Sequence, residues 1–311
     1  MALTSRIELH GPPASDPEDY LSASLGVIFP DDVTNQHGDA DHSLVYLSPH
    51  LPKPLHIALA DPSQDSDRKL FSHYLWNSSL LLAELIEAGS LGLPYHVGAG
   101  RPKPADFNVA GLECLELGAG TALPSLMAAF LGAKGVVASD YPSTTVLEML
   151  RNNIAANATV GCSPLGTLAP ITVAGHAWGE LDTPFATQDR GRFDRVFVCD
   201  CLWMPWQHAN LHRSIAWFLK GAKHGDRPSA EAKAWIVAGF HTGRAKMRDF
   251  FAESALGTVE LELESIHERD CDGVEREWAW DRGHEDVSER KRWHVVAVIR
   301  RRSAPSSGVA G

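Results

Sequence analysis

The clearest chemical signal in the sequence is a turn of small residues that joins an apolar run to a helical run. Residues 115–124 read LELGAGTALP. Glycine permits the positive φ values that a sharp turn needs, and it leaves room for a ligand to approach the backbone. The first turn of the following helix offers N–H donors that have no partner within the helix. The segment therefore predicts a small-molecule site at the end of a buried strand.

The same turn limits the kind of ligand that the site can hold. It lacks the third glycine of the dinucleotide-binding fingerprint and the Lys-Ser/Thr pair of a phosphate-binding loop. A dinucleotide cofactor is therefore disfavoured. Glu116 lies inside the strand end, and an acidic side chain there suits a cationic ligand such as the amino group and sulfonium of S-adenosylmethionine. We expect S-adenosylmethionine to be the cofactor.

A carboxylate follows the next apolar run. Asp140 and Tyr141 come about 20 residues after the glycine turn, and in nucleotide-binding α/β folds a carboxylate at this place accepts hydrogen bonds from the ribose hydroxyls. The alternative is that Asp140 caps the helix that starts at Ser143. The spacing after the glycine turn favours the ribose role, and Tyr141 is then placed to lie against the adenine.

Two aromatic segments end the third and fourth predicted strands. Residues 177–179 read AWG, and residues 199–206 read CDCLWMPW. Ligands of open α/β sheets bind beyond the carboxyl ends of the strands, so both segments should reach one crevice. We expect Trp178 to cover the adenine ring, while burial in the core is the alternative for Trp178, Trp203 and Trp206.

Apolar runs alternate with helical runs over most of the chain. Such alternation predicts βαβ units and a parallel sheet that is covered on both faces. The last two strands have no helix between them and should pair antiparallel. The pattern is that of a class I methyltransferase Rossmann-like α/β fold, a seven-stranded sheet of five parallel strands plus an antiparallel terminal pair, with helices on both faces. The predicted strands are 112–117, 135–139, 171–174, 195–199, 234–239, 259–266 and 293–300, and the predicted helices are 71–88 (ended by Gly89), 123–131, 143–156, 206–220 and 244–254.

Three parts of the chain differ in composition. Residues 1–68 are rich in Pro, Asp, Ser and His and predict an irregular N-terminal arm, with short apolar pieces at residues 25–29 and 43–47. Residues 69–302 carry the alternating pattern and should form the methyltransferase domain. Residues 303–311 should form a flexible tail.

The bulk composition argues against several classes of protein. Apolar residues make up 44% and charged residues 22% of the chain, as in ordinary soluble proteins. No apolar run reaches the roughly 20 residues that span a bilayer, so no membrane partner is expected. The net charge of −11 argues against a nucleic-acid partner, which would need a basic surface. Five cysteines without regular spacing suit a reduced cytoplasm.

No metal site is expected. Cys199 and Cys201 lack a second thiol pair at zinc-binding spacing. His208 and His212 are one helical turn apart, but no third ligand is evident, and they should form a solvated helix face. His241, which closes the fifth predicted strand, is a further candidate for contact with substrate.

An ordered set of motifs resembles one known family, the fungal nicotinamide N-methyltransferase-like proteins. These are similar to the elongation-factor methyltransferases of the class I seven-strand lysine methyltransferase family. The resemblance covers about residues 71–302. The motifs that carry it are HYLWNS at 73–78, the turn at 116–124, DYP at 140–142, Asn153 and Asn157, AWG at 177–179 and DCLW at 200–203.

The resemblance implies a substrate class and a set of site residues. Many lysine methyltransferases of this group carry Asp-x-x-Tyr or Asp-x-x-Phe after the fourth strand, where this chain has Asp200 and Trp203. We expect Asp200 to orient an amine and Trp203 to wall its pocket. The acceptor would be a lysine or N-terminus of a protein, such as a translation elongation factor, with a small-molecule amine as the alternative, and the enzyme would be a monomer. The implied cofactor contacts are Trp76, Gly118, Ala119, Gly120, Asp140, Trp178 and Cys199, to which the residue types add Glu116 and Tyr141.

Overall fold

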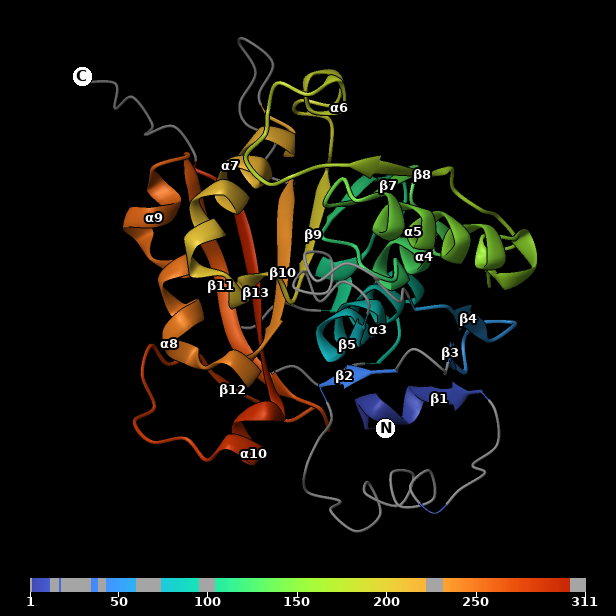
Figure 1. Cartoon of the computed structure of the whole chain (residues 1–311), viewed down its shortest axis with the longest axis horizontal. Coiled ribbons are helices and arrows are strands. Elements are labelled where there is room, and N and C mark those ends of the chain that lie inside the picture. Colours follow the sequence, from blue (N-terminus) through green and yellow to red (C-terminus); the bar gives the residue numbers. More distant parts are fainter. Residues whose placement is uncertain are drawn as a thin grey trace.

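A central eight-stranded sheet organises the chain (Figure 1). The computed structural model describes residues 2–11, 17, 35–38, 43–59, 74–94, 104–221 and 232–302. The strands of this sheet are β6 (Glu113–Leu117), β7 (Gly135–Asp140), β8 (Ile171–Gly175), β9 (Arg195–Cys199), β10 (Lys233–Gly239), β11 (Leu261–Asp270), β12 (Glu275–Glu277) and β13 (Trp293–Arg301). They lie side by side in the order β12-β11-β13-β10-β9-β6-β7-β8.

The pairing within the sheet confirms the predicted α/β fold with a largely parallel sheet, but the predicted count of seven strands is wrong, because the sheet has eight. Strands β8, β7, β6, β9 and β10 run parallel. Strand β13 pairs antiparallel with both β10 and β11. The short strand β12 was not predicted, because three residues inside a charged connection carry too little periodicity to identify. It pairs with β11 through His267, Glu268 and Arg269.

The strand order reverses between β6 and β9, and this reversal positions the site. The chain leaves β6 toward β7 on one side and returns to β9 on the other. Ligands of open α/β sheets bind at such a switch point, beyond the carboxyl ends of the strands. The glycine turn follows β6 directly, and Asp200 follows β9 directly.

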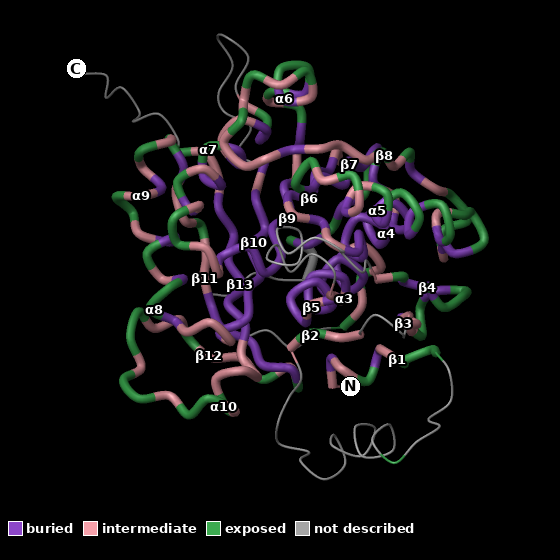
Figure 2. Tube along the Cα trace, in the orientation of Figure 1, coloured by how far each residue is buried: buried purple, intermediate pink, exposed green. Residues whose placement is uncertain are grey.

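Helices cover the sheet on both faces (Figure 1), and the central strands of the sheet are buried (Figure 2). Two separate apolar clusters fill the space between the sheet and the helices. Side chains alternate along each strand, so Val237 joins one cluster while Ile236 and Ala238 join the other. One cluster includes residues of α3 (Asn77–Leu91), α4 (Leu123–Phe130) and α5 (Thr144–Asn157), and the other includes residues of α6 (Pro184–Gln188), α7 (His208–Phe218), α8 (Arg244–Met247) and α9 (Glu253–Gly257).

Two predicted helices have different bounds in the structure. The first begins at Asn77, because Leu75 and Trp76 are extended and pair with Gln36–His37 as strands β5 and β2. It passes through Gly89 and ends at Gly92, whose left-handed φ of 65° lets its N–H reach the last turn. The predicted helix over 244–254 is broken into α8, a 3-10 turn and α9. Residues 71–73 lie outside the described part.

Part of the predicted N-terminal arm forms a small antiparallel sheet. It contains β1 (Ile7–His10), β3 (Ser43–Tyr46) and β4 (Leu55–Ile57). The buried side-chain amides of Asn153 and Asn157 on α5 bind the backbone of residues 56 and 58. Each amide oxygen accepts from a backbone N–H, and each amide NH2 donates to a backbone carbonyl. Residues 25–29 and 303–311 lie outside the described part, so the domain boundaries stay a prediction.

Candidate functional site

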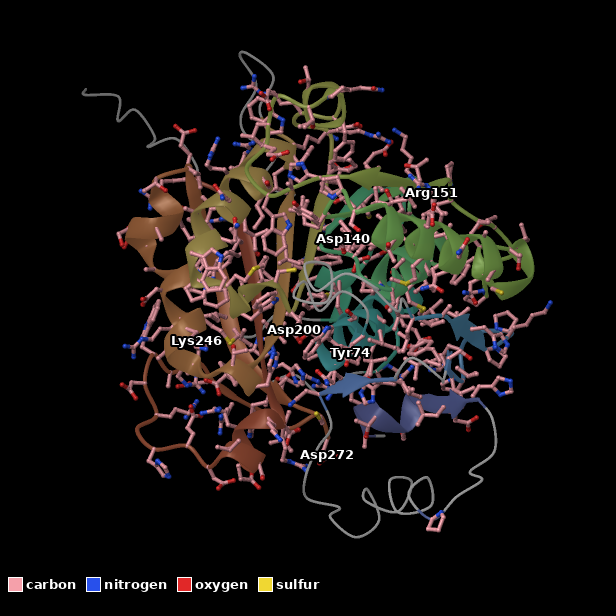
Figure 3. All side chains as sticks on the ribbon, viewed as in Figure 1. Tyr74, Asp140, Arg151, Asp200, Lys246 and Asp272 are labelled. Atoms are coloured by element: carbon pink, nitrogen blue, oxygen red, sulfur yellow. The ribbon has the colours of Figure 1, made fainter. Side chains whose placement is uncertain are left out.

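A cavity of about 490 Å³ opens at the carboxyl ends of β6, β7 and β9. Its volume falls in the roughly 300–1,000 Å³ range of small-molecule sites. Figure 3 shows Tyr74, Asp140 and Asp200 near the centre of the molecule, and all three line this cavity. Of the residues predicted from sequence, the cavity is lined by Trp76, Gly118, Ala119, Gly120, Asp140, Tyr141, Trp178, Cys199, Asp200 and Trp203.

The glycine turn can take its shape only because it has no side chain at its first glycine. Gly118 has a φ of +71°, which is unfavourable for other residues. A Cβ there would lie 2.7 Å from the Cys201 sulfur and 3.2 Å from the Trp178 ring. The turn therefore places backbone without a side chain between Trp178, which follows β8, and Cys201, which follows β9.

Glu116 is the one predicted cofactor contact that does not line the cavity, and His241, named above as a candidate for substrate contact, does not line it either. Its Oε2 accepts hydrogen bonds from the Ser125 backbone N–H at 3.0 Å and the Ser125 hydroxyl at 2.5 Å, at the start of α4. Its Oε1 is buried without a hydrogen-bond partner. Burial raises the pKa of this carboxyl to about 8. The structure thus places Glu116 behind the glycine turn, as a largely protonated group that supports the first turn of α4.

Asp140 connects the end of β7 to the glycine turn. Its Oδ2 accepts a hydrogen bond from the Gly120 N–H at 2.8 Å, and its Oδ1 accepts one from the Tyr141 N–H at 2.7 Å. Burial raises the pKa of Asp140 to about 6. The N-cap of α5 is Ser143, and no side chain caps that helix start. Asp140 is therefore directed to the cavity and the turn, not to α5.

The loop after β8 carries Trp178 into the cavity and is fixed to α7. The Gly179 N–H donates to the Ser214 hydroxyl at 2.9 Å, and the His176 ring nitrogen lies 2.9 Å from the same hydroxyl. Trp178 also packs against one apolar cluster, so it has both a core contact and a cavity face. At the rim, the Tyr141 side chain is half exposed.

Asp200 is held in an unusual backbone conformation at the end of β9. Its φ of 54° is left-handed, a strained geometry that is enriched at functional sites. Its Oδ2 accepts a hydrogen bond from the Ser78 hydroxyl at 2.9 Å, and its Oδ1 accepts one from the Gly239 N–H at 3.3 Å. Burial raises the pKa of Asp200, against the opposing effects of nearby His241 and Ser78. The carboxylate is buried yet lines the cavity.

Aromatic rings surround the Asp200 end of the cavity. Tyr74 and Trp76 meet edge to face at 6.3 Å, and Trp203 also lines the cavity. Trp206 contacts Trp203 edge to face at 6.4 Å, but it is 71% exposed and does not line the cavity. The wall therefore consists of Tyr74, Trp76 and Trp203.

The side chains of Cys201, His208 and His212 have structural roles. The Cys201 thiol donates to the carbonyls of Leu117 and Cys199, and burial raises its pKa well above the ordinary value. The predicted solvated face of His208 and His212 is wrong. Both side chains are buried. Each ring lies within hydrogen-bond distance of a backbone carbonyl, which takes the place that water would have on an exposed helix face. The described residues contain no cluster of three metal-binding side chains.

Several lining residues were missed from the sequence. Ser79 follows Trp76 on the first turn of α3, and Asn210 comes from α7. Ser78 does not line the cavity, but it binds Asp200 across 122 positions of sequence. No local pattern marks such a contact. The other missed lining residues are Tyr74, Thr121, His176, Ala177, Gly179, Glu180, Cys201, Met204 and Gln207.

Comparison with known proteins identifies relatives over about half of the chain. It is 31% identical over 156 residues to the protein N-terminal and lysine N-methyltransferase of Schizosaccharomyces pombe, covering 49% of this chain and 52% of that protein. It is 30% identical over 178 residues to the Gibberella zeae protein of the same name, covering 54% and 58%. The chain therefore spans little more than half the length of these curated relatives.

The family match and the fold agree. A solved Streptococcus mutans structure, described as that of an S-adenosylmethionine-dependent methyltransferase, covers 92% of this chain with 65% of its own, at a TM-score of 0.52 and 13% identity. At that identity the likeness shows the fold alone. In the described part of the chain, no helix combines the length and apolarity needed to cross a membrane. Residues 63–223, which contain the glycine turn, Asp140 and Asp200, match the family described as "Lysine methyltransferase", and the chain belongs to this family of S-adenosylmethionine-dependent methyltransferases.

Proposed function

We propose that the protein transfers a methyl group from S-adenosylmethionine to an amine of a protein substrate. The observation that carries this proposal is the buried Asp200 carboxylate, which lines one cavity together with aromatic rings, the glycine turn and Asp140. A carboxylate beside aromatic rings suits a cationic or amine acceptor. Both named relatives are described as protein N-terminal and lysine N-methyltransferases, which supports a protein amine as the acceptor.

The cavity fits the proposed cofactor at the end that contains Asp140. The Asp140 carboxylate, which backbone N–H groups hold in place, is available to ribose hydroxyls. Trp178 and Tyr141 line the cavity beside it and are suited to an adenine ring. Bare backbone at Gly118 leaves space that a Cβ would fill. Because Glu116 is buried behind the turn, we assign it to supporting the turn and α4.

S-adenosylmethionine supplies an electrophilic methyl group on a sulfonium that is already a good leaving group. The chain must align a neutral amine with that methyl, an effect worth up to roughly 7–11 kcal/mol. A free lysine has a pKa of about 10.4, so a proton must first be lost. Desolvation beside Tyr74, Trp76 and Trp203 lowers an amine pKa, and each ring face stabilises a cation by about 0.5–2 kcal/mol. Asp200 orients the amine within this wall.

We place the chain, within the family, with the fungal nicotinamide N-methyltransferase-like and elongation-factor methyltransferase group. The motif set from residues 73 to 203 supports this placement. On that basis the substrate is a translation elongation factor, and the enzyme is a cytoplasmic monomer without a nucleic-acid partner. Five free, buried cysteines and a net charge of −11 are consistent with these assignments. The methyltransferase domain is assigned to residues 69–302, after an arm over residues 1–68.

The test is incubation of the purified protein with S-adenosylmethionine labelled on the methyl group and a fungal cell extract. The extract is then separated into protein and small-molecule fractions. We expect label in the protein fraction, in an acid-stable form typical of N-methyl groups. Asp140→Ala serves as the matched control for background labelling. Label confined to small molecules would assign the activity to the alternative acceptor, and equal labelling by the control would remove the assignment.

A further inference from the structure

We propose that His241 is a positioning residue that takes the acceptor's proton from Asp200 and passes it to solvent. The inference rests on the proposed amine methylation and deepens it, because it names the route by which a charged amine becomes the neutral nucleophile. His241 lies outside residues 63–223, the segment that matches the family. Nothing in that match assigns a role to it.

The geometry places the His241 ring between Asp200 and the aromatic wall. His241 belongs to the 3-10 turn Phe240–Thr242, which follows β10. Its Nδ1 lies 3.8 Å from the Asp200 Oδ1, and its ring stacks on Trp76 at 4.9 Å with an interplanar angle of 21°. A small rotation of either side chain would close the gap to a hydrogen bond, for which about 2.7–3.2 Å is needed.

The His241 Nδ1 is enclosed, although the side chain as a whole reaches solvent. Nδ1 is fully buried and has no hydrogen-bond partner in the structure. The side chain is 16% exposed, so solvent reaches it at atoms other than Nδ1. A buried, unpaired nitrogen is costly unless it acquires a partner. Asp200 is the candidate partner. Among the described residues, its carboxylate is the one that lies within ion-pair distance of the ring.

Gly239 leaves the space through which the two groups face each other. Its backbone N–H donates to the Asp200 Oδ1 at 3.3 Å. A Cβ at this glycine would lie 3.1 Å from the His241 Nδ1. One residue thus both orients the carboxylate and keeps the approach to the imidazole open.

Apart from Asp200, no charged group of the described residues is within ion-pair distance of this ring. Arg244 on α8 is bound by Glu268 and Glu285. Arg290 on α10 (Val287–Lys291) donates to the backbone carbonyl of His241, not to its ring. Burial lowers the pKa of His294 on β13 to about 3, which leaves that neighbour neutral. The remaining charged groups on the elements that contact the turn are Lys246 on α8, Glu289 and Lys291 on α10, and Arg300 and Arg301 on β13. The two arginines are at the opposite end of β13 from His294, where Arg300 donates to Glu262 and Arg301 donates to the Leu219 carbonyl.

The proton balance is simple. The substrate enters as an ammonium, whose N–H bond breaks as an O–H bond forms on Asp200. That proton moves to the His241 Nδ1, which restores the carboxylate, and the opposite nitrogen releases a proton to water. The freed lone pair then forms the N–C bond as the S–C bond of the cofactor breaks. The S–C electron pair stays on sulfur, so a neutral thioether is the leaving group and the product amine is a methylated secondary ammonium. No oxidant or further reactant is needed.

The competing explanation is that His241 only packs against Trp76. The His241→Phe variant separates the two, because phenylalanine keeps an aromatic ring on Trp76 but cannot carry a proton. The His241→Ala variant opens space that added imidazole can fill. His56→Phe, at an exposed position of β4, is the matched control for replacing a histidine.

The experiment measures single-turnover methyl transfer to a protein acceptor from pH 7 to pH 10, together with S-adenosylmethionine affinity by calorimetry. For His241→Phe we expect normal affinity and a rate about tenfold or more below wild type at pH 7. The deficit should shrink as the pH approaches the ordinary lysine pKa of about 10.4, because more of the amine then arrives already neutral. Imidazole should restore part of the His241→Ala rate.

Each outcome decides the matter. A His241→Phe deficit that is absent, or that is the same at every pH, would assign His241 a packing role and overturn the inference. Failure of imidazole to act on a folded, cofactor-binding His241→Ala protein would do the same. If the wild-type enzyme and His56→Phe transferred no methyl group to protein, the proposed function itself would fail, which is a separate result.

Discussion

Replacing Gly118 by alanine tests whether the glycine turn is shaped for a ligand. The φ of +71° costs a residue with a Cβ about 1–2 kcal/mol. The new Cβ would also stand 2.7 Å from the Cys201 sulfur and 3.2 Å from the Trp178 ring. Such overpacking typically costs a further 1–3 kcal/mol, and it is relieved by moving these two cavity residues.

Gly111→Ala is the matched control. Gly111 has a φ of +74°, and a Cβ there would meet nothing within 4 Å. Both variants should therefore lose a similar 1–2 kcal/mol or so of backbone energy in urea unfolding. Only Gly118→Ala should also weaken S-adenosylmethionine binding, by about 5- to 150-fold if the 1–3 kcal/mol of steric cost appears in the dissociation constant. Calorimetric titration that gave Gly118→Ala the same affinity as Gly111→Ala would refute this reading of the turn.

Three further results follow from the same geometry. Asp140→Ala should weaken S-adenosylmethionine binding about tenfold or more, because a charged hydrogen-bond acceptor is lost; calorimetry showing unchanged affinity would remove Asp140 from the site. Trp178→Ala should raise the cofactor dissociation constant while the fold persists, whereas a low melting temperature with normal binding per folded molecule would show a purely core role. The raised pKa of Glu116, about 8 when folded against 4.5 for the free side chain, means that its contribution to stability is complete below pH 4.5 and declines as the pH rises through 8. Glu116→Gln should therefore flatten the fall in unfolding free energy between pH 5 and 8, and an unchanged slope in urea titrations would contradict the assignment.

Local pattern was enough to predict seven of the eight strands of the central sheet and one end of the cavity. The run that becomes β6 is apolar and ends in small residues, so both its burial and its turn could be read from neighbouring positions. The same holds for β7 and Asp140, because strand and carboxylate are adjacent in sequence. Helix ends were less predictable. Gly89 and Gly92 both suit a C-terminus, and only tertiary packing decides that the helix continues to the second.

Contacts between distant segments could not be predicted in this way. The Ser78 hydroxyl reaches Asp200 across 122 positions, and α3 must dock against the sheet before that pairing exists. His208 and His212 have the spacing of a polar helix face, yet both are buried, because carbonyls of Leu202 and Phe250 give each ring a partner. His241 lies near Asp200 only because β10 pairs beside β9. At the Asp200 end of the cavity, the motif supplies Asp200 and Trp203, and the fold supplies the contacts of Asp200 with Ser78 and His241.

The measurement that tests the central claim most directly is single-turnover methyl transfer to a protein acceptor at saturating S-adenosylmethionine. Asp200→Asn should bind the cofactor with most of its normal affinity but react about a hundredfold or more slowly, because its carboxylate serves the amine. Trp203→Ala should also be slow, and Trp203→Phe should recover part of the loss because it restores an aromatic face. Near-normal rates for both Asp200→Asn and Trp203→Ala would contradict the account, because the amine would then be held elsewhere.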